Sequence, residues 1–394
     1  MNAPPSSSRT CLGVLLAAGD GVRMRSAIPK ALHPVAGRPM VAHALAALRD
    51  AGASAIAVVV GPDRDDVAAA ARAFAPEAEV FIQSERRGTA HATLAARAAI
   101  ARGYDDLLVV YADAPLVTAA SLKALRQALA DGADVAALAF EAANPTGYGR
   151  MIERDGRLVA IREEKDATAA ERAIRRCNAG PAAIRGAQAL ALLELVGCDN
   201  AQKEFYLTAV AEIAAGRGLK AETRLAAEEE AMGVNDRLQL AAAEAAMQRR
   251  LRHKAMVEGA TLVAPETIFL SADSVIGRDV TIEVPDTEMT TNAQRLRPFR
   301  LRTARPIEEQ NRRQAKLAGQ MVDDLDRRVP VVIEKIAMGA QHAELQGETA
   351  LMVRAAALGD HRQVGGRQAP VLRQFVLARI GRHRHPSPGL RGCG

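Results

Sequence analysis

The sequence has no tryptophan and few aromatic residues of any kind. Aromatic side chains make up 3% of the 394 residues, whereas 49% of the chain is hydrophobic. The core must therefore consist mainly of alanine, valine and leucine, which suits closely packed helices and strands. A chain of this length has room for two or three domains, one of them large enough to bury a sizeable core.

Cysteine is also scarce, and the spacing of the cysteines excludes both a metal site built from them and a disulfide framework. The four cysteines are scattered, so they form neither a metal-ligand spacing nor the disulfide framework of a small secreted domain. Long apolar runs of the length that spans a bilayer are absent, and the polar start at residues 1–10 lacks the apolar segment of a signal peptide. We therefore expect a cytoplasmic protein with no membrane partner. The cysteines are Cys11, Cys177, Cys198 and Cys393.

Positive charge is concentrated in the C-terminal quarter of the chain. Residues 286–394 hold 19 Lys or Arg and 11 Asp or Glu, so they contribute +8 to the formal charge of +6, and residues 1–285 contribute −2. Dispersed arginines attract nucleic-acid phosphates nonspecifically. This segment has no interleaved aromatics and no recognisable nucleic-acid module, so solvated disorder is the favoured interpretation and nucleic acid is not an expected partner.

Short apolar runs alternate with helical patterns through the first half of the chain. Uniformly apolar strands separated by helices indicate a mostly parallel sheet covered on both faces, so we predict an α/β, Rossmann-like domain. A hairpin is expected around the Asp155-Gly156 turn. The expected strands are residues 11–16, 55–60, 79–83, 107–111 and 134–140, and the expected helices are residues 39–51, 64–73, 89–101 and 119–129.

The pattern changes along the chain define the expected domain organisation. The α/β domain gives way to an alanine-rich helix, then to short β-like runs at 267–270 and 280–284, and finally to arginine-rich sequence with little periodicity. We therefore expect a flexible N-terminus at 1–10, the α/β domain at 11–235, a linking helix at 236–260, a short β segment at 261–285 and an irregular, poorly ordered basic tail at 286–394.

The clearest functional signal is a glycine loop directly behind the first expected strand. The run Leu16-Ala-Ala-Gly-Asp-Gly-Val-Arg-Met24 is followed by Pro29-Lys30. Glycines let backbone N–H groups converge on an anion, and Arg23 and Lys30 supply the positive charge that a polyphosphate needs. The loop lacks the third glycine of the dinucleotide fingerprint and the Gly-Lys-Ser/Thr ending of a P-loop. It predicts a nucleoside triphosphate site, and the two cations disfavour the alternative of a turn without a ligand.

Two further loops are expected at the same edge of the sheet, because ligands bind beyond the carboxyl ends of parallel strands. Asp113 follows a buried strand and is a candidate Mg²⁺ ligand; the alternative is an N-cap of the next helix. Gln83 has a donor and an acceptor in its amide, so it can read the edge of a nucleobase. Thr89 beside Gly88 either belongs to the same site or caps the following helix.

Together these segments resemble the N-terminal domain of a bacterial bifunctional family, N-acetylglucosamine-1-phosphate uridylyltransferase/glucosamine-1-phosphate acetyltransferase, commonly called GlmU. The resemblance covers roughly residues 11–284. The matching segments are LAAGDGVRMRSAIPKALHPVAGRPM, QSERRGTAHA, VVYADAPL, NPTGYGRM, IREEKDAT, NAG, NAQKEFYLT and GVNDRLQL, in the order of the family. The first motif marks sugar-phosphate nucleotidyltransferases in general, and the later ones are much narrower.

The resemblance implies a reaction of UTP with N-acetylglucosamine 1-phosphate that gives UDP-N-acetylglucosamine and pyrophosphate, for cell-envelope precursor synthesis. It also implies a role for each matching residue. Arg23 and Lys30 would be catalytic and hold the triphosphate; Ala17, Gly19, Gln83, Gly88 and Thr89 would bind uridine; Gly149, Glu163 and Asn178 would bind the sugar phosphate; Asp113 and Asn235 would coordinate Mg²⁺. Positioning and electrostatics can supply most of the catalysis, since the sugar phosphate is already a nucleophile.

The sequence departs from the family at two positions near the expected sugar site. Pro181 follows Asn178-Ala-Gly where a strand should run, and a proline cannot donate to a strand ladder. Ala209 follows Tyr206-Leu-Thr where an acidic residue is usual in the family. Both substitutions are expected to disturb the sugar pocket without removing a proposed ligand.

The larger departure is the C-terminal region. The family carries its acetyltransferase and its trimer contacts on a left-handed β-helix of hexapeptide repeats, whereas residues 286–394 show no regular aliphatic hexad. Residues 261–285 then correspond to a remnant start of that β-helix, and neither acetyl transfer nor the family trimer is expected. A frameshift would explain the abrupt change in composition, and a genuine variant with a new tail is the alternative.

Two other functions stay open on the sequence. One is a nucleotidyltransferase for another sugar 1-phosphate, because the glycine-loop motif is shared across such enzymes. The other is a catalytically impaired nucleotide-binding protein whose fold is compromised by the unusual tail.

Overall fold

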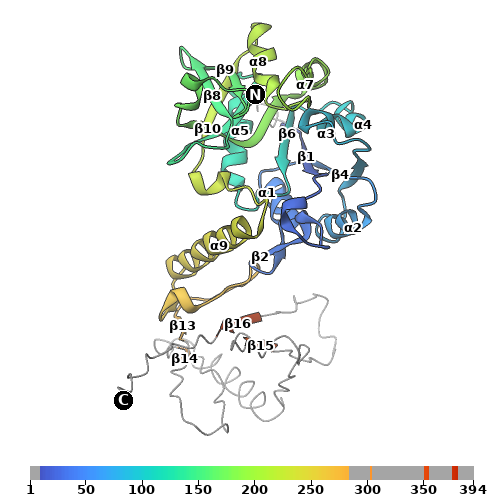
Figure 1. Ribbon diagram of the computed structural model, residues 1–394. Coiled ribbons are helices and arrows are strands. Elements are labelled where there is room, and N and C mark those ends of the chain that lie inside the picture. The colour runs from blue at the N-terminus through green and yellow to red at the C-terminus, as the bar shows by residue number, and fades with distance from the viewer. Residues whose placement is uncertain (1–8, 284–301, 304–349, 355–374, 380–394) are drawn as a thin grey trace, which may run out of the picture. The chain divides into compact units, whose positions relative to one another are not determined.

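The computed structural model describes residues 9–283, 302–303, 350–354 and 375–379 (Figure 1). The chain divides into two compact units, residues 1–247 and 248–394. The division falls inside helix α9 (Arg237–Val257), within the stretch expected to be a linking helix. Most of the expected flexible N-terminus and most of the expected basic tail lie outside the described residues.

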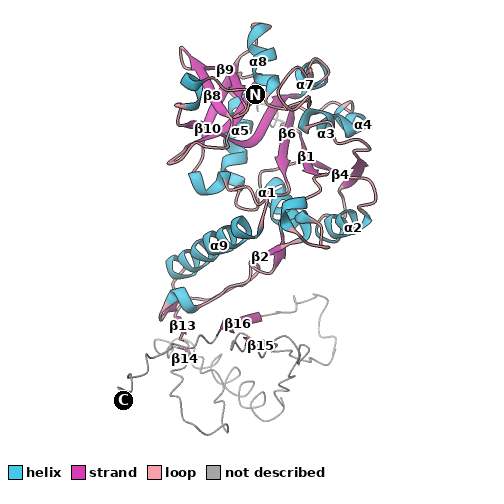
Figure 2. Ribbon diagram, viewed as in Figure 1, coloured by secondary structure: helices cyan, strands magenta, loops and turns pink. Residues whose placement is uncertain are grey.

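A mixed sheet of nine strands forms the centre of the first unit (Figure 2). Four of its pairings are parallel, and the long strand β10 is antiparallel to both of its neighbours in the main sheet. In spatial order the strands are β11 (Ala221–Leu225), β7 (Val135–Glu141), β10 (Arg176–Arg185), β6 (Asp106–Tyr111), β1 (Cys11–Ala17), β4 (Ala55–Val60) and β5 (Glu79–Ile82), with the hairpin β8 (Arg150–Arg154) and β9 (Arg157–Arg162) attached to β10.

Helices cover both faces of this sheet, which confirms the predicted α/β fold. Alternate residues of β1 point to opposite faces, and every residue of the strand is buried. Leu15 packs into one core cluster and Val14 into the other. Helices α1 (Met40–Asp50), α2 (Asp65–Phe74) and α5 (Ala119–Ala130) cover one face, and α3 (Thr89–Ala95), α4 (Arg97–Ile100), α7 (Gly186–Leu193) and α8 (Ala209–Gly216) cover the other.

One expected helix is two helices in the structure. The pattern predicts a single helix over residues 89–101, but α3 ends at Ala95 and α4 begins at Arg97. Thr93 Oγ1 donates a hydrogen bond to Thr89 O at 2.9 Å, and such back-bonding bends helices. The N–H of Ala96 bonds to Thr93 O, a 3₁₀-type contact that interrupts the α pattern.

Strand β10 runs through Pro181, although this proline cannot donate to a strand ladder. The pairing between β10 and β7 shifts register between Asn178 and Ala182, so Pro181 lies in a bulge where no ladder donor is required. The Asn178 side chain accepts a hydrogen bond from Gly180 N at 3.1 Å inside this bulge. The proline is therefore accommodated beside the expected sugar site.

Short elements connect the main ones in the first unit. The glycine loop after β1 leads into two turns of 3₁₀ helix, and a small ladder follows before α1. These elements are η1 (Val22–Met24), η2 (Lys30–Leu32), β2 (Pro34–Val35), β3 (Arg38–Pro39), α6 (Ala169–Arg172) and η3 (Glu228–Ala231).

The second unit contains the end of α9 and a set of short strands. Its elements are β12 (Thr261–Leu262), η4 (Pro265–Thr267), β13 (Val280–Ile282), β14 (Arg302–Thr303), β15 (Ala350–Arg354) and β16 (Phe375–Arg379). The β-like run at 267–270 forms only an isolated bridge at Phe269. The two main-chain polar groups of Leu270 bond instead to the side-chain amide of Gln248, each at 2.7 Å. Among the described residues, no helix combines the length and the apolarity that a bilayer crossing requires.

Candidate active site

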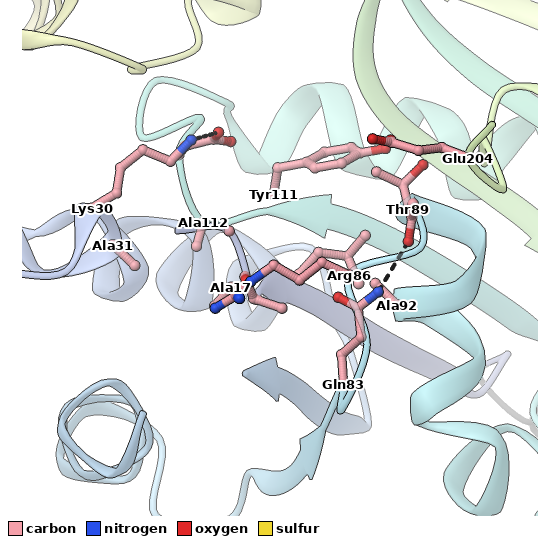
Figure 3. A pocket seen from close by; sticks show the side chains of 15 residues that line it. Ala17, Lys30, Ala31, Gln83, Arg86, Thr89, Ala92, Tyr111, Ala112 and Glu204 are labelled. Atoms are coloured by element: carbon pink, nitrogen blue, oxygen red, sulfur yellow. Dashed lines mark hydrogen bonds and ion pairs between the residues drawn. The ribbon is translucent and has the colours of Figure 1, made fainter. Parts of the chain in front are cut away.

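A cleft of about 250 Å³ lies beyond the carboxyl ends of β1, β5 and β6 (Figure 3). This is the edge at which parallel α/β sheets bind ligands. Seven of the residues predicted from the sequence line it, from both the glycine loop and the loops after β5 and β6. The lining residues are Leu16, Ala17, Ala18, Gly19, Lys30, Ala31, Gln83, Arg86, Gly88, Thr89, Ala92, Tyr111, Ala112, Asp113 and Glu204.

Lys30, Asp113 and Asn235 meet at one end of this cleft. Lys30 Nζ lies 2.5 Å from Asp113 Oδ2 and 3.1 Å from Asn235 Oδ1. The main chain brings the two oxygen donors together, because Val234 N donates to Asp113 O at 2.8 Å. Asn235 is held in turn by a hydrogen bond from its N–H to Gln239 Oε1 at 2.7 Å.

Asp113 does not cap the following helix, so that alternative reading of the sequence is wrong. Helix α5 begins at Ala119, and its N-cap is Thr118, whose Oγ1 accepts a hydrogen bond from Ser121 N at 3.2 Å. The carboxylate of Asp113 is instead directed at Lys30.

The glycine loop packs closely against Lys30 at Gly21. Gly21 has φ of +62°, and a Cβ atom built on it would lie 2.5 Å from Lys30 Cβ. Only glycine fits there, since the left-handed conformation and the close approach both exclude a side chain. Arg23, the other predicted cation, lies on η1 with an exposed side chain and does not line the cleft.

Gln83 lies on the wall of the cleft opposite Lys30 (Figure 3). Its side chain is 4% exposed, and its Nε2 bonds to Gly88 O and to His91 Nδ1, both at 3.2 Å. These contacts fix the orientation of the amide that the loop after β5 presents to the cleft.

The loop at Gly88 and Thr89 is joined to a distant segment of the chain. Thr89 is the first residue of α3 and not its N-cap; its Oγ1 accepts a hydrogen bond from Leu207 N at 2.8 Å. Gly88 has φ of +111°, and a Cβ on it would lie 2.6 Å from backbone atoms of Phe205. The strand-to-helix loop and residues 205–207 therefore pack backbone against backbone.

The three residues predicted to bind the sugar phosphate form a second group. Asn178 N donates to Gly149 O at 2.8 Å, and a Cβ on Gly149 would lie 3.5 Å from both Asn178 Cβ and Glu163 Oε2. Thr208 Oγ1 donates to Glu163 Oε1 at 2.9 Å. Burial raises the pKa of the Glu163 carboxyl, and the charge of Asp166 raises it further.

Tyr111 connects the two groups of residues. It lines the cleft, and it also lines a smaller cavity together with Asn178 and Thr208. Burial raises the pKa of the Tyr111 hydroxyl, and the negative charge of Glu163 adds to this effect. The phenol therefore stays neutral and can donate or accept a hydrogen bond at the junction.

Comparison with known proteins gives matches over the residues that form this cleft. Residues 13–182 match the MobA-like NTP transferase domain. Residues 13–182 are a nucleotidyltransferase domain. Over 277 residues the chain is 61% identical to the bifunctional protein GlmU of Xanthobacter autotrophicus, 56% to that of Azorhizobium caulinodans and 53% to that of a Bradyrhizobium strain. Each match covers 70% of this chain and 62% of the relative, so the chain spans under two thirds of the length of these relatives.

The donor set at this end of the cleft suits the divalent metal that the similarity to nucleotidyltransferases suggests. A carboxylate oxygen and an amide oxygen converge on one cation, the ammonium of Lys30, and oxygen ligands are those that hard divalent cations prefer. Within the described part of the chain, no three His, Cys, Asp or Glu side chains form a metal-binding group. A metal here would take two protein oxygens and complete its shell with water and phosphate oxygens.

Arg86 is a second cation of the cleft and is not among the residues predicted from the sequence. Arg86 Nε donates to Ala18 O at 2.9 Å, and its NH2 forms an ion pair of 2.5 Å with Asp20. It therefore connects the loop after β5 to the glycine loop. The only signal in the sequence was its place between Gln83 and Gly88, where two adjacent arginines are equally plausible surface residues.

Proposed function

We propose that the chain transfers a uridylyl group from UTP to N-acetylglucosamine 1-phosphate, with pyrophosphate as the second product. The observation that carries the proposal is the position of Lys30 Nζ between Asp113 Oδ2 and Asn235 Oδ1, at the end of a cleft that also holds Gln83. A cation, two oxygen donors and a buried amide are the groups that a nucleoside triphosphate requires. The identity to GlmU proteins over the same residues supports UTP and this sugar phosphate as the proposed substrates.

Uridine would lie along the apolar wall between the glycine loop and α3. Ala17 and Gly19 would contact the nucleotide from one side, while Gln83, Gly88 and Thr89 would contact it from the other. The buried amide of Gln83 would read the base edge, because it is held at a fixed orientation by its two internal hydrogen bonds.

The sugar phosphate would bind next to Gly149, Glu163 and Asn178. Asn178 has its Oδ1 engaged by Gly180 N, so its amide nitrogen is the group available for a sugar oxygen. Glu163 lies within 3.5 Å of the position above Gly149, where it would accept a hydrogen bond from a sugar hydroxyl.

The reaction is a displacement at the α-phosphorus of UTP. An oxygen of the sugar phosphate forms a bond to the α-phosphorus, the bond from that phosphorus to the oxygen bridging to the β-phosphorus breaks, and its electron pair leaves with pyrophosphate. Lys30 would neutralise charge that develops during this displacement, and Arg23 would contact the outer phosphates. No side chain needs to act as a general base, because the attacking phosphate oxygen is already deprotonated at neutral pH.

Mg²⁺ would be held by Asp113 and Asn235, and it would supply charge neutralisation at the phosphates of UTP. Acetyl transfer is not part of this proposal, since the matched region covers 62% of the bifunctional relatives. The cytoplasmic location, the oligomeric state and the domain boundaries remain predictions from the sequence.

Pyrophosphate release from the purified full chain tests the proposal. The assay combines Mg²⁺ with each of UTP, dTTP, CTP, ATP and GTP, and with N-acetylglucosamine 1-phosphate, glucose 1-phosphate and glucosamine 1-phosphate in turn. We expect UTP and N-acetylglucosamine 1-phosphate to give the highest kcat/KM. A higher value for another pair would replace the proposed substrates, and no release with any pair would favour a binding protein over an enzyme.

A further inference from the structure

Arg150 is the largest of the fully buried side chains that the structure describes, and it carries a charge. It lies at the start of β8, directly after Gly149, and is 1% exposed. Arginine is rarely buried to this degree, because the desolvated guanidinium is costly unless its hydrogen bonds are satisfied. The hydrogen bonds and the ion pair of Arg150 therefore indicate its structural role.

The guanidinium of Arg150 joins three separate segments. NH1 donates to Tyr148 O in the loop before β8. Nε and NH2 donate to Arg172 O, at the end of α6, at 3.3 and 3.2 Å. NH2 also forms an ion pair of 2.8 Å with Glu164 Oε2 in the turn after β9.

Glu164 connects the guanidinium of Arg150 to the loop before Gly149. Its Oε2 accepts a hydrogen bond from Gly147 N at 3.2 Å, so one carboxylate contacts both the buried guanidinium and the loop that precedes Gly149. Glu164 also follows Glu163 directly in the chain. The Arg150–Glu164 pair thus fixes the backbone on both sides of the gap between Gly149 and Glu163.

We propose that Arg150 and Glu164 are positioning residues for the sugar phosphate, which set the separation of Gly149 and Glu163. The inference rests on the proposed function, because these two residues are assigned to the sugar phosphate there. Neither Arg150 nor Glu164 lines the 250 Å³ cleft assigned to the nucleotide. The pair therefore acts on one substrate and leaves the other unaffected.

The geometry of the contacts requires arginine at this position. The planar guanidinium reaches two carbonyl oxygens and a carboxylate at once from fixed directions, whereas a lysine ammonium is a single point on a flexible stem. A lysine would keep the positive charge, but it could not bond to both carbonyl oxygens and the carboxylate at once. Lys and Met at position 150 should therefore both impair sugar-phosphate binding.

The test compares R150M, R150K and E164Q with the wild-type chain and with R176M as a matched control. Arg176 lies on the neighbouring strand β10, with ion pairs to Glu141 at 2.8 Å and to Glu153 at 2.6 Å, but it does not contact Gly149 or Glu163. We expect KM for N-acetylglucosamine 1-phosphate to rise about tenfold in R150K, which corresponds to one lost buried hydrogen bond, and by more in R150M, which loses every contact of the guanidinium. E164Q should raise it about threefold. KM for UTP should stay within about twofold in all variants, and R176M should leave both KM values within that range.

A parallel rise of both KM values in R150M, or the same change in R176M, would overturn the inference, because the effect would then not be specific to the sugar phosphate or to the Arg150–Glu164 pair. If R150M does not fold, E164Q decides, since glutamine retains an acceptor for Gly147 N; an unchanged KM for the sugar phosphate in E164Q would overturn it. A wild-type chain without turnover would instead contradict the proposed function, so the two failures are distinguishable.

Discussion

Lys30 Nζ lies 2.5 Å from Asp113 Oδ2, although the two residues follow different strands and are 83 positions apart in the chain. The same ammonium contacts Asn235 Oδ1 at 3.1 Å. It thus occupies the point on which both proposed metal ligands converge. A divalent metal held by these oxygens would have to displace the ammonium, and Lys30 would then be available to contact the triphosphate.

The first prediction follows from this competition. Lys30→Met should bind Mn²⁺ more tightly than the wild type in the absence of nucleotide, by about tenfold, because no cation has to be displaced from Asp113. Calorimetry or the electron paramagnetic resonance signal of free Mn²⁺ measures this affinity. Arg86→Met is the matched control: it removes the same charge from the same cleft, but Arg86 pairs with Asp20. Equal affinities in Lys30→Met and the wild type would show that the ammonium and the metal do not share a site.

The second prediction concerns the two oxygen donors. Asp113→Ala together with Asn235→Ala should lower kcat about a hundredfold or more, because charge that develops at the phosphates is no longer neutralised. Pyrophosphate release at saturating Mg²⁺ measures the loss. Double variants that retain wild-type turnover would remove these residues from the metal site.

The third prediction is a pH dependence of stability from Glu163. Burial raises its pKa in the folded chain, whereas the unfolded chain has a value of about 4.3. Below that pH the carboxyl is neutral in both states. As the pH rises from there toward the higher folded pKa, the unfolded chain loses its proton first, so the folded state loses stability.

Glu163→Gln removes this loss and keeps an acceptor for Thr208 Oγ1. The variant should have the same Tm as the wild type at pH 4 and a higher Tm at pH 7, as measured by calorimetric scans across this range. A lower Tm at pH 7 would mean that the ionised carboxylate stabilises the fold. KM for the sugar phosphate should rise in the same variant, since the proposed hydrogen-bond acceptor has lost its charge.

The fourth prediction compares two glycines with positive φ. A Cβ on Gly88 would lie 2.6 Å from the backbone of Phe205, whereas one on Gly103 would meet no atom within 4 Å. Gly103→Ala should cost about 1 kcal/mol from backbone strain alone, and Gly88→Ala should cost about 3 kcal/mol or more, because the two backbones must separate. Urea denaturation measures both values. Similar costs would show that the contact between residues 88 and 205 does not stabilise the fold.

Much of the sheet could be predicted because its strands are buried on both faces. The apolar runs that became β1, β4 and β6 were visible as continuous hydrophobic segments, and the loops after them were expected at one edge. The accommodation of Pro181 could not be predicted, since it depends on a register shift against β7 that no local pattern encodes.

The residues of the candidate site could be predicted from the sequence, but the contacts between them could not. Lys30 was recognised as a cation, yet its contact with Asn235 joins residues 205 positions apart and exists only in the folded chain. Arg86 could not be predicted for a related reason. The local sequence does not distinguish a functional arginine in a polar loop from an ordinary surface arginine. The buried Arg150 was likewise indistinguishable from a surface arginine, because its burial depends on α6 and the turn after β9.

A labelled substrate shows whether the α-phosphorus of UTP is transferred to the sugar phosphate. UTP radiolabelled at the α-phosphorus is incubated with the full chain, Mg²⁺ and N-acetylglucosamine 1-phosphate, and the products are separated by chromatography. We expect the label to appear in UDP-N-acetylglucosamine in an amount equal to the pyrophosphate released, and Asp113→Ala to suppress both. Label that stays in UTP, or that appears only in UMP or on the protein, would contradict the proposed function.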